Sequence, residues 1–115
     1  MDLDESILKH IKEAIGLSDE DKSFDTEVLT HINGSIGDLN QNGVGNPIDV
    51  DKNTTWRDLQ NPQQKAGNVY FKMIPQYIAL NTKVLFDPPP PSSVERYAAS
   101  INKALWRLKV AYEDI

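Results

Sequence analysis

The side chains most able to do chemistry in this 115-residue sequence are two histidines and a short run of acidic residues. His10 and His31 could each bind a metal ion, but a histidine site needs further ligands at helical spacing, and neither histidine has them. We therefore predict that both histidines are exposed on the surface. The run 19–21 offers carboxylate oxygens of the kind that calcium prefers, but its spacing does not match an EF-hand loop. A solvated loop is the better interpretation.

Other catalytic patterns are missing from the sequence. It has no cysteine, which excludes disulfides, thiolate nucleophiles and cysteine metal sites. The glycine-rich segment 43–47 lacks the Lys-Ser/Thr ending of a phosphate-binding loop, and Gly-x-Ser-x-Gly does not occur. These observations predict a protein that is not an enzyme and that uses no cofactor and no metal.

The overall charge narrows the class of partner. Seventeen Asp and Glu residues oppose 12 Lys and Arg residues, for a net charge of -5. This balance disfavours a nucleic-acid groove binder and an anionic membrane surface, because both attract basic clusters. The acidic start, residues 1–5, does not resemble a signal peptide, and no apolar run approaches the roughly 20 residues that span a membrane. We expect one domain, 1–115, that is made in the cytoplasm.

Helical periodicity dominates the first half of the chain. One apolar stripe predicts a helix over about 4–15, which ends at Gly16 in a left-handed C′ position. A second helix is predicted from about Thr26 to Gln41, with Asp25 as its N-cap and Phe24 placed for a hydrophobic staple. Segment 44–54 looks irregular. The sequence Thr-Trp-Arg-Asp at 55–58 resembles a capping box that starts a short helix and turns Trp56 inward.

The second half of the chain predicts a helical hairpin. Segment 64–86 is expected to be helical, with Pro75 either kinking it or starting a new helix. A stiff turn follows, formed by Asp87, Pro88, Pro89, Pro90 and Pro91. A last helix over about 93–112 then repeats apolar residues at alternating spacings of four and three. The predicted fold is all-α, a small bundle of four to five helices with a long C-terminal helix.

The buried anchors of this bundle are predicted from the apolar stripes of its helices. They are Ile11, Ile32, Ile36, Ile78, Leu85, Ile101, Leu105 and Leu108, and the seam of the last helix also includes Val94, Ala98 and Tyr112.

Two helix faces suggest contacts with other molecules. On the second helix, Gly34 and Gly37 lie opposite the apolar stripe, where small residues would let another backbone approach closely. Glycines tolerated on a solvated face explain them equally well. On the last helix, Ala99, Trp106 and Val110 form a second facet opposite the main seam. That facet is either a protein interface or the far side of a helix buried on both sides within the domain.

Several segments, in order, resemble the head–tail connector (adaptor, head-completion) family of tailed phages. The similar stretches are Phe24–Val28, His31–Asn33, Leu39–Gly45, Thr55–Leu59, Tyr77–Leu80, Lys83–Pro89 and Leu105–Leu108. The run Leu-Phe-Asp-Pro-Pro at 85–89 is the most recognisable. The chain departs from the family pattern in the segment 60–68, at Pro75 and in its longer proline run.

The resemblance implies an all-helical, non-enzymatic subunit of the virion neck. Such subunits form a ring, expected to have twelve copies, beneath the portal protein. The ring would bridge the portal to a downstream connector or tail-terminator protein and help to retain packaged DNA, which passes through the channel without sequence-specific contact. The alternative is a DNA-binding regulator of helix-turn-helix type, because the last helix carries Arg96, Lys103, Arg107 and Lys109.

Overall fold

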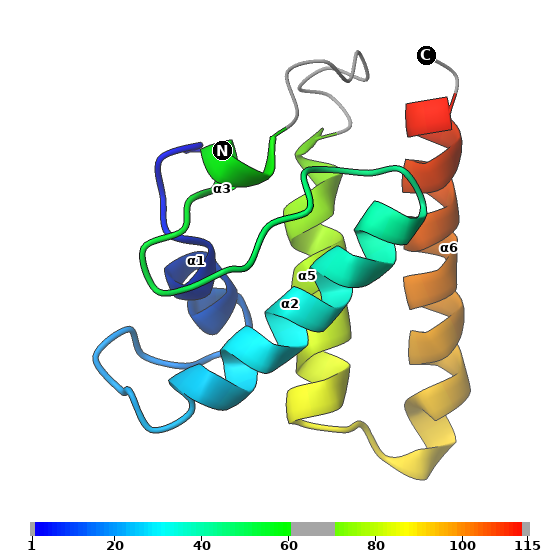
Figure 1. Cartoon of the computed structure of the whole chain (residues 1–115). Helices are drawn as coiled ribbons and strands as arrows, with labels where there is room; N and C mark the ends of the chain where they lie inside the picture. Colours follow the sequence, from blue (N-terminus) through cyan, green and yellow to red (C-terminus); the bar gives the residue numbers. More distant parts are fainter. Residues whose placement is uncertain (1, 61–70, 114–115) are drawn as a thin grey trace.

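The computed structural model of the chain describes residues 2–60 and 71–113, and this part is helical with no β-strand. The elements in order are α1 (Ile7–Ala14), α2 (Asp25–Gln41), α3 (Trp56–Leu59), α5 (Met73–Phe86), the 3₁₀ turn η1 (Pro91–Ser93) and α6 (Val94–Glu113). Helix α2 crosses one face of α5, while α1 and α6 lie on opposite flanks of α5 (Figure 1). The predicted all-α bundle with a long last helix is confirmed.

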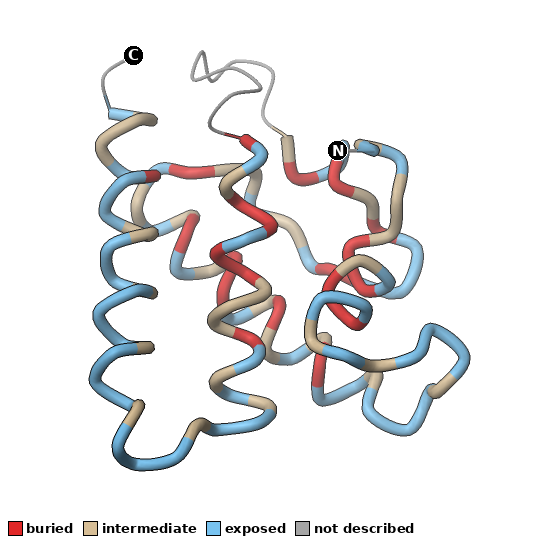
Figure 2. Tube along the Cα trace, turned by 180° about the vertical axis from the view of Figure 1, so that it is seen from behind, coloured by how far each residue is buried: buried red, intermediate tan, exposed pale blue. Residues whose placement is uncertain are grey.

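The core lies where α2 crosses α5, and α1, α3 and α6 each add side chains to it (Figure 2). Its members are large apolar side chains with almost no exposed surface. They include Ile7, Ile11, Val28, Ile32, Ile36, Leu39, Trp56, Leu59, Ile74, Tyr77, Ile78 and Leu108. The predicted capping box of α3 is present, with Thr55 and Asp58 bonding reciprocally, and it turns Trp56 into this core.

Helix α1 begins later than the sequence predicted. Residues 3–6 form a turn and a single bridge beside 54–57, with Arg57 N donating to Leu3 O at 2.8 Å and Ile7 N donating to Thr54 O at 2.9 Å. Ser6 is the N-cap, and its hydroxyl accepts from Lys9 N at 3.4 Å. The predicted start near residue 4 was wrong because this pairing satisfies the backbone of residues that would otherwise form a first helical turn. The predicted left-handed Gly16 is confirmed, with φ of 87°.

A buried lysine joins α1 to the start of α2. Lys12 has 0% exposed surface, and its ammonium lies 2.8 Å from a carboxylate oxygen of Asp25. The same ammonium donates to the carbonyl oxygens of Asp21 at 2.6 Å and Asp19 at 3.2 Å. Asp25 is therefore the first residue of α2 and not its N-cap, which is Phe24. The sequence prediction failed here because the carboxylate is held by a distant cation.

Phe24 is the N-cap of α2 and so is not at the N′ position that the predicted staple requires. Its ring packs edge-on against Phe86 at the end of α5, with 5.2 Å between the ring centroids. Pro75 is the third residue of α5, so it lies in the first turn, where a proline is tolerated. The predicted helix began at 64, and its portion 64–70 lies outside the described residues.

The end of the α5–α6 hairpin extends beyond the packed core. Leu85 lies on the same face as Ile74 and Ile78 but is 50% exposed, and Val94 is 47% exposed. Both were predicted to be buried, and Ala98 is exposed as well. The periodicity gave the correct face, but near the turn that face passes the region that the other helices cover (Figure 2). From Ile101 onward the seam packs against the core, and Leu108 is fully buried. Ile101 and Leu105, predicted as buried anchors, are only half-buried.

We expect the free energy of unfolding to depend strongly on Lys12. The variant Lys12→Met should lower it by about 3 kcal/mol, because the Asp25 carboxylate and two carbonyls would lose their cation. Lys9→Met is the matched control, since Lys9 is an exposed residue of the same helix and should change stability by less than about 0.5 kcal/mol. Urea unfolding measures both. Equal stabilities for the two variants would contradict the structural role of Lys12.

A second prediction concerns alkaline pH. Burial, followed by the charge of Asp38 and a hydrogen bond to it, raises the pKa of the Tyr77 phenol from 10.0 to about 12. The folded protein therefore keeps this proton better than the unfolded chain does. The resulting stability is fully present below pH 10.0 and is lost as the pH rises through about 12.

Tyr77→Phe should remove this pH dependence. Near neutral pH the variant should be less stable than the wild type by about 1 kcal/mol, through its lost hydrogen bond. Near pH 11.5 the wild type should have lost about 2 kcal/mol, because the phenol ionises more readily in the unfolded chain, whereas the variant has no phenol to ionise. The difference should therefore reverse, and the variant should become the more stable protein by about 1 kcal/mol. Urea unfolding at pH 8 and near pH 11.5 measures it, and parallel losses in both proteins would contradict the assignment.

Candidate interaction surfaces

The outer face of α6 is an apolar stripe that the fold leaves uncovered. Ala99, Lys103, Trp106 and Val110 follow one another at spacings of four, three and four residues, which places them on one side of the helix. Trp106 is 63% exposed, Ala99 is exposed and Val110 is half-buried. A helix buried on both sides within the domain would have covered Trp106, so that alternative is wrong.

Basic side chains flank this stripe. Arg96 and Arg107 are exposed beside Lys103, and none of the three forms an ion pair with the described residues. Lys109 lies elsewhere on the helix and pairs with Glu113 at 3.9 Å. The outer face of α6 is therefore apolar along its centre and positively charged along one edge.

The outer face of α2 has the opposite charge and a different shape. A Cβ atom built at Gly34 or Gly37 would meet nothing within 4 Å, so the surface at both glycines is open. Glu27 and Asp38 are exposed seven residues before and four residues after Gly34, on the same side of the helix. Helix α2 contains no lysine or arginine. Its outer face is thus low in relief and negatively charged.

The predicted proline turn connects α5 to α6. Asp87 is the C-cap of α5 and η1 starts at Pro91, so Pro88, Pro89 and Pro90 bridge the two helices. A hollow of about 230 Å³ lies beside the turn and is lined by Lys83, Val84, Asp87, Pro88, Pro89, Pro90 and Tyr97. With Leu85 and Val94 exposed nearby, the turn is an additional accessible apolar feature at one end of the molecule.

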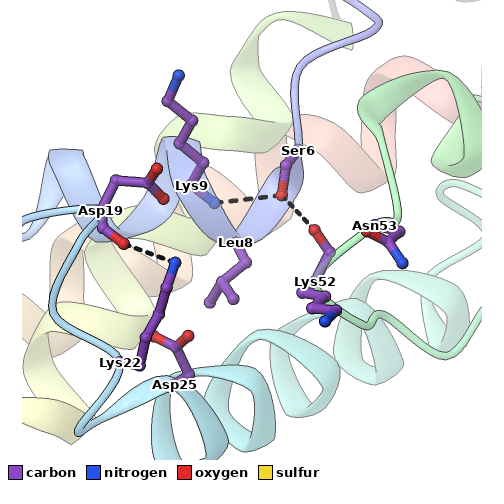
Figure 3. Close-up of a pocket in the computed structure, with 8 residues that line it drawn as sticks. All are labelled: Ser6, Leu8, Lys9, Asp19, Lys22, Asp25, Lys52 and Asn53. Atoms are coloured by element: carbon purple, nitrogen blue, oxygen red, sulfur yellow. Dashed lines mark hydrogen bonds between the residues drawn. The ribbon is translucent and has the colours of Figure 1, made fainter.

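A larger hollow of about 500 Å³ lies where α1 meets the loops around it (Figure 3). Its lining residues are Ser6, Leu8, Lys9, Asp19, Lys22, Asp25, Lys52 and Asn53. Leu8 points into it, and two of the charged side chains that line it have partners of their own. Lys22 donates to the Asp19 carbonyl at 2.8 Å, and Asp25 pairs with Lys12. The hollow offers no convergent set of free polar groups of the kind that catalysis requires.

The sequence predicted that both histidines are exposed on the surface, and this prediction is wrong, because both are half-buried. Nδ1 of His10 accepts a hydrogen bond from the indole nitrogen of Trp56 at 3.1 Å, and the two rings meet edge-on. Its side chain is 31% exposed, and that of His31 is 21% exposed. Because Nδ1 of His10 accepts from Trp56, it cannot also donate to Glu5 at 3.6 Å, and we assign a neutral ring there. His10 therefore has a structural role as the partner of a buried indole.

Within 2–60 and 71–113, no three His, Cys, Asp or Glu side chains are grouped so that they could hold a metal ion. None of the described helices combines the length and apolarity that crossing a membrane requires. The surfaces of α2 and α6 therefore remain the strongest functional candidates.

A comparison with known families decides what kind of protein carries these surfaces. The model of the phage connector protein family matches residues 7–114. The chain belongs to the phage connector protein family. The connector is thus a structural component of a virion, and the predicted resemblance is confirmed. Neither the search of curated proteins nor the search of solved structures returns a match.

The sequence predicted the outer stripe of the connector's last helix. It did not predict the acidic residues on the outer face of α2. Ala99, Trp106 and Val110 were predicted as one facet, and the structure brings them together on one side of α6. Gly34 and Gly37 lie on a separate surface. The prediction did not include Glu27 and Asp38, although their spacing from Gly34 already places them on its side of the helix. That spacing was the signal that could have found them.

Alanine substitution should change stability in opposite directions at a helical glycine and at a glycine with positive φ. Gly34→Ala should stabilise the isolated subunit by about 1 kcal/mol, because alanine favours helix and the new methyl group meets nothing. Gly45→Ala should destabilise it by more than about 1 kcal/mol, since φ is +76° and the Cβ would lie 3.0 Å from Cδ1 of Leu59. Thermal unfolding of the monomer measures both. A destabilising Gly34→Ala would show that the α2 face is not open.

Proposed function

We propose that this connector forms a ring, expected to have twelve copies, between the portal protein and the next connector or tail-terminator protein in the virion neck. The ring would be made in the host cytoplasm and would help to retain packaged DNA. Family membership supports a role at the junction of head and tail. Neither the copy number nor the partners follow from that membership, and both belong to the proposal.

The proposal rests on the large exposed surface of the last helix. Helix α6 has 20 residues, and only Leu108 is buried. A tryptophan that is 63% exposed lies on its outer face beside Val110. Exposed aromatic side chains with apolar neighbours are typical of the centre of protein interfaces. A subunit of a ring would cover this face with another protein.

The charge of the subunit fits a channel through which DNA moves. The net charge is -5, and a lumen of like sign would not grip the duplex as dense lysine and arginine would. We propose that an acidic surface lines the channel and lets DNA slide. A ring structure with a strongly basic lumen would contradict this part of the proposal.

A DNA-binding regulator of helix-turn-helix type is the second candidate. The unpaired basic residues Arg96, Lys103 and Arg107 on α6 favour it. Recognition helices bind DNA through a basic face, and such binding weakens steeply as salt increases. A salt-dependent electrophoretic shift with duplex DNA would support the regulator, whereas the connector role predicts no such shift. Neither candidate is an enzyme or needs a cofactor.

Solution mass tests the connector role. We expect the protein to gain mass with increasing concentration, or on addition of a purified portal ring, in light scattering or sedimentation. Trp106→Ala should weaken this assembly by at least about tenfold in concentration, because exposed interface tryptophans rank among the strongest contributors to binding. The circular dichroism spectrum of the monomer should stay unchanged.

Two outcomes would contradict this prediction. A wild-type protein that joins neither itself nor the portal would end the connector proposal. A Trp106→Ala variant that unfolds would place Trp106 in the fold and not in an interface. Lys52→Ala is the matched control, since Lys52 is exposed in a loop away from α6 and should leave both assembly and folding unchanged.

A further inference from the structure

We propose that the outer face of α6 in one subunit docks on the outer face of α2 in the next copy of the same chain. The two faces are the basic apolar stripe around Lys103 and Trp106 and the acidic open face around Gly34. The proposal rests on the proposed ring and names the two surfaces that would close it.

Charge complementarity identifies the second copy as the partner. Lys103 and Arg107 on α6 have no ion-pair partner among the described residues. Glu27 and Asp38 on α2 likewise pair with no lysine or arginine in the described part, although Glu27 lies 3.7 Å from His31 and Asp38 contacts the Tyr77 phenol. Each face thus carries charges that its own fold leaves uncompensated, and the signs are opposite. Such patterning steers association and fixes register.

Shape supports the same pairing. Trp106 is 63% exposed on α6, whereas Gly34 and Gly37 add no side chain to the surface of α2 and have nothing within 4 Å of their Cβ positions. A large side chain on one helix can lie over small residues on another, so the two backbones can approach closely. The glycines alone identify no partner, but here they lie between the two acids that would meet the basic residues.

The placement of the two faces suits a head-to-tail contact. Helix α2 crosses α5 with its outer side turned away from the core, and α6 lies at a different edge of the molecule (Figure 1). The described parts of these helices form no ion pair with each other within one chain. A contact between two different surfaces is heterologous, and it saturates every subunit only when the rotation closes into a ring. The proposed contact is therefore of the heterologous kind that a ring of identical subunits requires.

Charge reversal tests the contact on the full chain. The variant Lys103→Glu/Arg107→Glu and the variant Glu27→Lys/Asp38→Lys should each raise the concentration for assembly by more than about tenfold, because like charges would face each other. Combining all four substitutions, or mixing the two double variants, should restore assembly, since opposite charges would meet again. Sedimentation and electron microscopy, alone and on a portal ring, measure the outcome.

A matched control separates this effect from net charge. Lys9→Glu/Lys52→Glu changes the charge as much as Lys103→Glu/Arg107→Glu does, but on exposed residues away from both faces and from the proline turn, and should assemble like the wild type. Glu27→Lys alone provides a variant that leaves the contact of Asp38 with Tyr77 intact. Thermal unfolding of each monomer shows whether it is folded.

The absence of cysteine in the chain allows a direct test of proximity. Gly34→Cys combined with Val110→Cys should give ladders of covalent oligomers with a short bifunctional maleimide, whereas either single substitution should give at most dimers. Gly34 tolerates a side chain because nothing lies within 4 Å of its Cβ position.

The outcomes distinguish this contact from the connector role. If the wild type assembles on itself or on a portal while the reversed variants behave like the control, the α6–α2 contact is wrong and the connector role survives. Loss of assembly without rescue in the mixture would mean that the faces bind another partner, such as the portal, and would also overturn the contact. A wild type that never assembles overturns both proposals.

Discussion

The buried ammonium of Lys12 is the interaction on which the rest of the arrangement depends. An ammonium without exposed surface is tolerated only when polar groups replace its water, and here two loop carbonyls and the Asp25 carboxylate do so. The three acceptors come from the loop after α1 and from the first turn of α2. One cation therefore fixes where α2 begins relative to α1. Because α2 crosses α5, and α5 carries α6, this contact also helps to set the direction in which the outer faces point.

Asparagine side chains then hold the long segment between α2 and α3. Asn33 bonds both to the amide and to the carbonyl of Val50, and Asn40 donates to three successive carbonyls at 44–46. Asn46 donates onward to the carbonyls of Asp58 and Gln60. These bonds satisfy a backbone that has no strand or helix partner of its own. Since Asn33 and Asn40 lie on one flank of α2, the segment is held there, and the flank with Glu27, Gly34 and Asp38 stays open.

The sequence predicted what local patterns specify and failed where a distant partner decides. Helical spacing located α2 and α6 to within a residue or two, and the capping box at Thr55 and the turn at Gly16 follow from rules that involve only neighbours. The start of α1, the role of Asp25 and the indole partner of His10 depend on residues far along the chain, which periodicity cannot name. Leu85 shows a third case, because spacing gives the face of a helix but not how far its neighbours extend.

The sequence also shows the apolar stripes of α6, whereas the fold decides which stripe is left for a partner. Two apolar stripes on one helix were visible in the sequence, but only the fold decides which stripe meets the core. Ile101, Leu105 and Leu108 face α5, so the stripe of Ala99, Trp106 and Val110 gives the isolated subunit no packing. Leaving a large indole in water forgoes the burial that makes aromatic residues favourable, and it invites non-specific association. The basic edge beside that stripe limits which surfaces can cover it, because an apolar face lined by uncompensated cations fits an acidic partner and repels a basic one.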